Sequence, residues 1–324
     1  MSPPCNDERF PFDQQIRHSF KKLRRIFCIG SLLLPLFLTA QTTPRVWVVY
    51  PQTAPPERVV YDSIREGIRA TAGQGGLQVE ELSTSQIAAL PQVRSPDLVI
   101  TLGSQALGDV QEKVDRGRII AGATQIARST KDLNAVSTLI DPSLALQTLR
   151  ELAPRVQRVH VVITQSSDRT WIQDAQQAAH DLNVELVVHS ARTTSEAGTH
   201  YLNIFRYGNP QTDSLWLIQD RDSLSRELLA RVVEESWANN FIVFSNVLEH
   251  VRAGTLFSLY PDPQQLGERL GAIAVHTQNN PKAEPRVEYL KEVSRAVNMR
   301  VAAHLQLNID ARLRRQFELR LGEG

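Results

Sequence analysis

Polar side chains that could bind a small solute stand directly after the apolar runs in the first half of this sequence. Gly103, Ser104 and Gln105 follow the run Asp97–Leu102 and precede an amphipathic stretch. At such a junction, backbone N–H groups and a serine hydroxyl can receive a carboxylate or another anion. An ordinary helix N-cap explains the same residues equally well. The candidates in this half that we carry forward are Tyr50, Gln52, Ser104, Gln105, Thr124 and Gln125.

A second set of polar residues follows the apolar runs of the second half. Asp220 could pair with a ligand amine, pair with Arg221 beside it, or cap the next helix. Asp168 is a possible ligand contact or a helix N-cap, and Trp171, one helical turn further on, offers a stacking surface or packs against its own lobe. The candidates in this half are Gln165, Ser166, Ser167, Asp220, Asn246 and Tyr260.

The motifs that would indicate an enzyme are missing. The sequence contains no HExxH, GxSxG, Walker A or GxGxxG motif, and the glycine-rich stretch 73–76 lacks the Lys-Ser/Thr that phosphate chemistry needs. The histidines have no shared metal-ligand spacing. We therefore expect a binding protein without catalytic activity, metal or cofactor.

These candidates must be positioned by alternating strands and helices. Short β-rich runs alternate with amphipathic stretches, which predicts parallel sheets flanked by helices. Asp141 and Pro142 predict the start of a helix that Pro154 ends. The end of the chain adds a strand at 254–260, a helix at 263–278 and a further helix from about Ala296. The predicted strands are Val46–Tyr50, Leu77–Leu82, Asp97–Leu102, Arg118–Ala123, Val159–Thr164, Val184–Val188, Ser214–Gln219 and Phe241–Ser245.

The first forty residues predict a secretory leader. Four basic residues between positions 21 and 25 precede the apolar stretch Ile26–Leu38, which suits a signal peptide cut after Ala40. An uncleaved membrane anchor is the alternative. With 324 residues, 42% of them hydrophobic, and a formal net charge of +1, the chain has a globular composition and no charge excess that would attract nucleic acid. From residue 41 on, the chain has 30 basic and 32 acidic residues and no cysteine.

Several stretches resemble the ABC transporter substrate-binding protein family with the type I periplasmic fold. Pro142–Val162 is similar to the helix-to-strand passage that begins the second lobe in that family, and Asp97–Ala106 to its strand, glycine, hydroxyl and helix segment. The late segments Phe241–Ser245, Ala253–Tyr260 and Leu266–Asn280 also match, as does the closing Ala296–Ile309, where Gln306 replaces the usual glycine.

The resemblance implies two Rossmann-like lobes, each a parallel sheet flanked by helices, joined by a hinge that the chain crosses several times. We expect lobe one to comprise 45–133 and about 252–284, and lobe two 134–251 and about 285–318. The implied function is a periplasmic protein that closes on a small polar solute, by default an amino acid, and delivers it to an ABC permease. A sensory module that reports to a membrane signalling protein is the alternative. Open parallel sheets independently place a ligand beyond the carboxyl ends of their strands.

Overall fold

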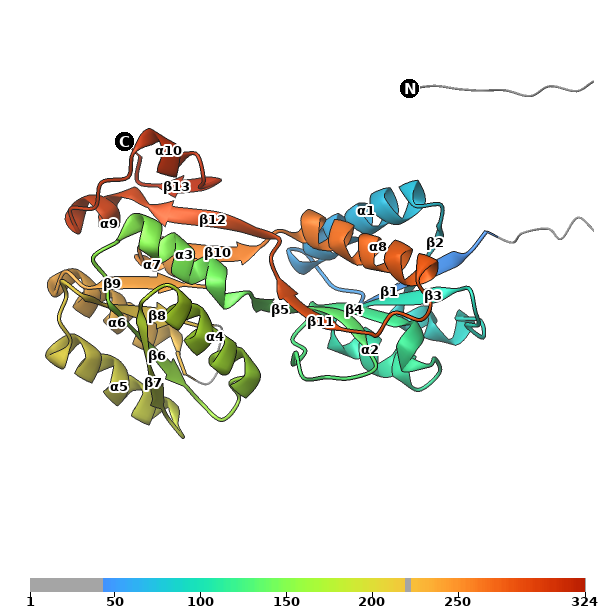
Figure 1. The fold of residues 1–324 in the computed structure, drawn as a ribbon, viewed down its shortest axis with the longest axis horizontal. Coiled ribbons are helices and arrows are strands. Elements are labelled where there is room, and N and C mark those ends of the chain that lie inside the picture. The colour runs from blue at the N-terminus through green and yellow to red at the C-terminus, as the bar shows by residue number, and fades with distance from the viewer. Residues whose placement is uncertain (1–42, 219–222, 324) are drawn as a thin grey trace, which may run out of the picture. The chain divides into compact units, whose positions relative to one another are not determined.

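The computed structural model describes residues 43–218 and 223–323. The expected leader, residues 1–40, lies outside the described residues. The rest of the chain forms two sheets with helices on their faces (Figure 1). The α/β architecture predicted from the alternation of apolar runs is confirmed.

The first sheet has six strands, and all of its neighbouring strands are parallel. Its order is β11-β5-β4-β3-β1-β2. Strand β3 is buried along its whole length, which agrees with its continuous apolar run. The strands are β1 (Arg45–Tyr50), β2 (Gln78–Ser83), β3 (Leu98–Leu102), β4 (Ile119–Thr124), β5 (Asn134–Ile140) and β11 (Val287–Leu290).

Helices α1 (Glu57–Gln74) and α8 (Pro263–Asn279) pack together over this sheet, although they are far apart in sequence. Glycines permit the close approach: a Cβ atom at Gly267 would lie 2.0 Å from the Ile64 carbonyl oxygen. Helix α2 (Ser104–Gln111) packs against the opposite face, where Ala106 and Val110 join a separate apolar cluster. Two short 3-10 helices, η1 (Thr84–Ala89) and η2 (Arg116–Arg118), complete this part of the chain.

The second sheet has seven strands in the order β13-β12-β10-β9-β8-β6-β7. All of its pairs are parallel except β10 with β12, which is antiparallel. The strands are β6 (Arg158–Ile163), β7 (Glu185–Ser190), β8 (Asp213–Leu217), β9 (Ile242–Ser245), β10 (Phe257–Pro261), β12 (Val293–Asn298) and β13 (Leu319–Leu321).

Helices cover both faces of the seven-stranded sheet. Helix α3 begins as predicted, because the Asp141 side chain accepts a hydrogen bond from the Ser143 N–H and Pro142 occupies the first turn. Residues of α3 and α4 join one apolar cluster, while residues of α5 and α6 join another. These helices are α3 (Pro142–Leu152), α4 (Arg169–Asp181), α5 (Thr194–Tyr207), α6 (Arg226–Ala238), α7 (Leu248–Ala253), α9 (Met299–His304) and α10 (Ala311–Arg314).

The chain crosses between the sheets three times, at positions that differ from those we expected. We expected Asn134 to begin the second lobe, but 134–140 forms β5 of the six-stranded sheet. We also assigned 252–284 to the first lobe, whereas β10 pairs in the seven-stranded sheet and only α8 packs on the first. Strand β11 then returns to the first sheet before β12 joins the second.

The helix predicted from about Ala296 begins later. Ala296 lies in β12, opposite Ser258 of β10, and the helix starts at Met299. The Asn298 side chain marks the start, because it accepts hydrogen bonds from the N–H groups of Arg300 and Val301.

Candidate functional site

A pocket lies where strand ends of the two sheets meet. The six-stranded sheet contributes residues of β5 and the segment after β4, and the seven-stranded sheet contributes residues that follow β6, β8 and β9. Asp168 is the only ionisable side chain among the described lining residues. The lining residues are Gln125, Leu139, Ile140, Ser167, Asp168, Trp171, Ile218 and Asn246.

Gln125 reaches the pocket because the chain bends at the end of β4. Ala123 has a φ of 54°, and the pairing of β4 with β5 shifts between Ala121 and Thr124. The N–H of Ile126 then donates to the fully buried Ser137 hydroxyl at 3.0 Å. This hydrogen bond holds the segment that carries Gln125 against β5.

The loop between β6 and α4 is held by its own hydroxyl and carboxylate groups. The Thr164 N–H donates to Ser167 Oγ at 3.0 Å, and the hydroxyls of Thr164 and Ser166 lie 2.7 Å apart. Asp168 Oδ1 accepts from the Trp171 N–H at 3.0 Å, which makes Asp168 the N-cap of α4. The N-cap interpretation of Asp168 is thus confirmed, and the same residue also lines the pocket.

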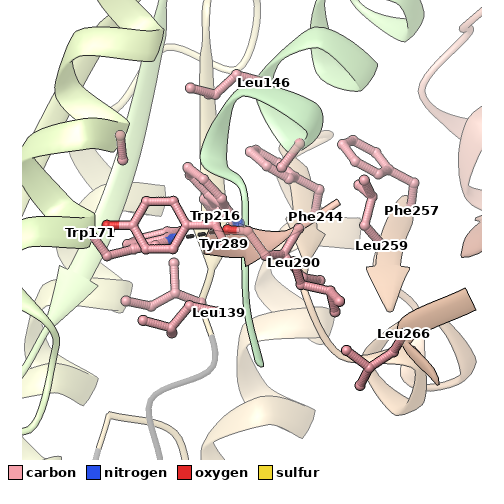
Figure 2. Close-up of a cluster of buried hydrophobic side chains, with 14 of the residues drawn as sticks. Leu139, Leu146, Trp171, Trp216, Phe244, Phe257, Leu259, Leu266, Tyr289 and Leu290 are labelled. Carbon is pink, nitrogen blue, oxygen red and sulfur yellow. Dashed lines mark hydrogen bonds between the residues drawn. The ribbon is translucent and has the colours of Figure 1, made fainter. Parts of the chain in front are cut away.

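Aromatic residues lie in a row that begins at Trp171, which lines the pocket (Figure 2). The Trp171 and Trp216 rings are 5.1 Å apart at 60°, and Trp216 stacks on Phe244 at 5.4 Å. Phe244 in turn stacks on Phe257 at 4.9 Å. Both indole N–H groups are bonded within the protein: Trp171 donates to the Ile140 carbonyl at 2.8 Å and Trp216 donates to Asn246 Oδ1 at 3.1 Å.

Asp174 on α4 contacts two residues from the part of the chain that carries the first sheet. It accepts a hydrogen bond of 2.8 Å from the Tyr289 hydroxyl of β11. It also forms an ion pair of 3.2 Å with Arg128. The Arg128 guanidinium also lies 5.5 Å from the Tyr289 ring centroid. Burial, followed by the hydrogen bond to Asp174, raises the pKa of Tyr289. The phenol therefore stays neutral and keeps its proton for Asp174.

Three of the predicted residues, Gln125, Ser167 and Asn246, line the same pocket. Tyr50 and Gln52 line a different one, where Arg65 lies 4.2 Å from the Tyr50 ring centroid.

The other predicted residues that the structure describes line neither pocket. Ser104 and Gln105 are exposed at the start of α2, and Gln165 and Ser166 are exposed in the loop after β6. Thr124 ends β4 and is half-buried. Tyr260 pairs with Ser294 of β12, and burial, followed by Glu318, raises its pKa. Asp220 lies outside the described residues.

Several lining residues were missed by the sequence analysis. Leu139 and Ile140 belong to β5, which the sequence pattern did not predict, and the pattern around Ile218 indicates only a strand. Tyr289 and Asp174, which join the two parts of the chain, carry no local signal. The β-branched residues of 134–140 are the signal that could have located β5.

Within the described ranges, no group of three or more His, Cys, Asp or Glu side chains is arranged to hold a metal ion. Among the helices of those ranges, none has both the length and the apolar character to cross a membrane.

No family model and no curated protein matches this chain. Its fold does match solved structures. A domain from Streptococcus pneumoniae, solved in complex with L-Trp, is 16% identical; the match covers 86% of this chain and 100% of that one, with a TM-score of 0.52. A substrate-binding protein with adhesive properties from Clostridium difficile, in its ligand-free, open structure, is 13% identical, with 83% and 97% covered and a TM-score of 0.59.

A conserved domain protein from Vibrio cholerae is 14% identical, with 86% and 100% of the two chains covered and a TM-score of 0.52. The matches extend over both sheets and over nearly the whole of each solved chain. The resemblance inferred from the sequence is therefore confirmed at the level of the fold. This chain has the two-lobed type I periplasmic binding fold of ABC transporter solute-binding proteins.

Proposed function

We propose that this protein is a periplasmic solute-binding protein that closes on a small polar ligand and delivers it to an ABC transporter. The observation that carries the proposal is the pocket that Gln125 shares with Ser167 and Asn246. Side chains from strand ends of both sheets meet there, so a bound solute would contact both lobes at once. Contacts to both lobes stabilise the closed arrangement by the difference in affinity between the two states.

The residues that line the pocket suit the apolar body of a small solute. Leu139, Ile140, Ile218 and Trp171 supply apolar surface, and two amide side chains supply polar contacts. Small ligand sites are commonly built from mostly apolar walls with a few fixed polar groups. An amino acid is the first class to test, since one protein of this fold was solved with L-Trp.

A thermal-shift screen tests the proposal directly. The chain from residue 41 on is heated alone and with amino acids, sugars, nucleosides and metal chelates. A ligand at about 100 times its Kd stabilises the folded state by about 2.7 kcal/mol. A specific rise in Tm supports ligand binding, whereas no rise with any class contradicts it.

Variants then locate the site. Gln125→Ala and Asn246→Ala should each weaken binding of the identified ligand about tenfold, since each removes a polar contact. Gln52→Ala is the matched control, because Gln52 lies in the other pocket. Weaker binding in Gln52→Ala with full binding in the other two would place the ligand elsewhere.

Cellular uptake separates transport from sensing. A strain lacking this gene should lose high-affinity uptake of the identified solute. Full uptake in that strain, together with a lost response to the solute, would favour the sensory role instead.

A further inference from the structure

Trp216 determines which end of the Asn246 amide faces the pocket. Its indole Nε1 lies 3.1 Å from Asn246 Oδ1. An indole N–H can only donate, so the atom that faces it must be the amide oxygen. The Asn246 amino group, Nδ2, is consequently turned away from Trp216.

Trp216 cannot readily move from this position. It is 1% exposed, stacks on Phe244 at an interplanar angle of 20°, and its ring centroid lies 5.1 Å from that of Trp171. Phe257 packs behind Phe244. The row of rings therefore fixes the donor before any ligand arrives, which reduces the ordering cost of binding.

Asn246 is itself fixed and faces the pocket. It is 6% exposed, and its backbone N–H donates to the Leu217 carbonyl at 3.3 Å. Among the described residues, its Nδ2 group has no hydrogen-bond partner. This donor is open to the pocket, so a solute that fills the pocket displaces its water, and that costs free energy unless the solute accepts from Nδ2.

Other polar groups around the pocket already bond to the protein. The Trp171 indole donates to the Ile140 carbonyl, Asp168 Oδ1 caps α4, and Ser167 Oγ accepts from the Thr164 N–H. Gln125 also lines the pocket, but no hydrogen bond in the described part of the chain fixes the orientation of its amide. Asn246 is thus the donor whose direction the fold sets.

We propose that Trp216 is a positioning residue that makes Asn246 a dedicated N–H donor, so that the pocket selects solutes carrying an oxygen acceptor at that point. A carboxylate, carbonyl or ether oxygen satisfies Nδ2, whereas a solute without an acceptor leaves it unpaired. A polar group of the site that is left unpaired weakens binding of the wrong solute, and this is how polar sites select between ligands. This inference rests on the proposed function, because it assigns a ligand chemistry to the same pocket.

The hydrogen bond can be tested without any ligand. The chain has four tryptophans, so the indole N–H signals in an NMR spectrum of ¹⁵N-labelled protein can be assigned by single Trp→Phe variants. Asn246→Ala should move the Trp216 indole proton upfield. The Trp171 indole proton, which is bonded to a backbone carbonyl, should stay in place. An unchanged Trp216 signal would overturn the inference.

Ligand selectivity is tested with L-phenylalanine, which carries a carboxylate, and phenethylamine, which lacks it. Trp216→Phe should weaken L-phenylalanine binding about tenfold and leave phenethylamine binding nearly unchanged. In the Asn246→Ala background, Trp216→Phe should have no further effect, because its role acts through Asn246. Trp47→Phe makes the same change in β1, outside the pocket, and is the matched control. It should leave the binding of both compounds unchanged.

The outcomes separate the two proposals. Additive losses in the double variant would show that Trp216 acts on binding through something other than Asn246, and would overturn the inference. Absence of any bound solute in the unaltered chain would contradict the proposed function, while the indole signal would still decide whether Trp216 holds Asn246.

Discussion

Acidification should destabilise the seven-stranded half of the protein through a histidine cluster outside the pocket. His160 Nε2 lies 3.3 Å from Asp213 Oδ2, and His160 Nδ1 lies 3.0 Å from His189 Nε2. The His200 ring from α5 is 5.5 Å from that of His189. Arg158 forms an ion pair of 3.4 Å with the buried Asp213.

The hydrogen bonds define how the two histidines carry their protons. Burial raises the pKa of Asp213, but hydrogen bonds from Asn209 and His160, among others, together hold it below its usual value. The resulting carboxylate accepts from His160 Nε2, so the neutral His160 ring must accept at Nδ1. His189 Nε2 therefore donates to it. A second proton on His160, at Nδ1, would point an N–H group at the N–H group of His189 Nε2 and break this hydrogen bond.

The loss of stability on acidification can be calculated from the pKa shift of His189. Burial, followed by His160 and His200, lowers the pKa of His189 from 6.5 to about 4. The unfolded chain takes up this proton first, so stability is retained above pH 6.5 and lost as the pH falls to about 4. The full shift corresponds to about 3.4 kcal/mol at 1.36 kcal/mol per pKa unit. Because the ring is only half-buried, we expect about 2 kcal/mol.

Urea unfolding at about pH 7 and about pH 4.5 measures this loss. His189→Gln keeps an amide donor near the Nε2 position and cannot take the charge, so it should lose about 2 kcal/mol less than the unaltered chain between the two conditions. His180→Gln, at a side chain that is 86% exposed, is the control and should follow the unaltered chain. Equal losses in His189→Gln and the unaltered chain would refute the reasoning.

Three further substitutions test the packing and the contact between the sheets. Gly267→Ala should destabilise the protein by about 2 kcal/mol or more in urea unfolding, because its Cβ would meet the Ile64 carbonyl at 2.0 Å. Gly108→Ala, in a helix with nothing within 4 Å of the added atom, should instead stabilise by about 0.5–1 kcal/mol; equal effects at both sites would contradict the close-packing argument. Tyr289→Phe should cost about 1–2 kcal/mol, since it leaves Asp174 without its phenol donor, and an unchanged unfolding midpoint would show that the bond is not formed in solution.

Most elements with a clear local pattern were predicted within a few residues. Strand β3 was expected at 97–102 and occupies Leu98–Leu102, and Asp141 caps α3 as its sequence context indicates. These elements carry their own signals, namely a continuous apolar run and a capping residue before a proline.

Strand β5 was missed because it contains a buried polar residue that accepts backbone hydrogen bonds. Ser137 is fully buried, and its hydroxyl accepts from the N–H groups of Ile126 and Leu139. A serine at a buried strand position interrupts the apolar pattern that predicts strands. Strand β12 was misassigned for a different reason. Its antiparallel partner β10 lies more than thirty residues earlier, so the sequence around β12 carries no local signal of the pairing.

The candidate site shows why residues at strand ends do not all share one pocket. Ser167, Ile218 and Asn246 follow β6, β8 and β9, which are neighbours in the seven-stranded sheet. Gln125 follows β4, beside the crossing strand β5.

Tyr50 also ends a strand, but β1 is two strands away from β4. At about 4.8 Å per strand, that separation is about 10 Å, more than a side chain of this size can bridge to the same small solute. The sequence identifies the edge of each sheet at which a ligand can bind. The order of the strands, set by which crossings the chain makes, then decides which residues at that edge act together.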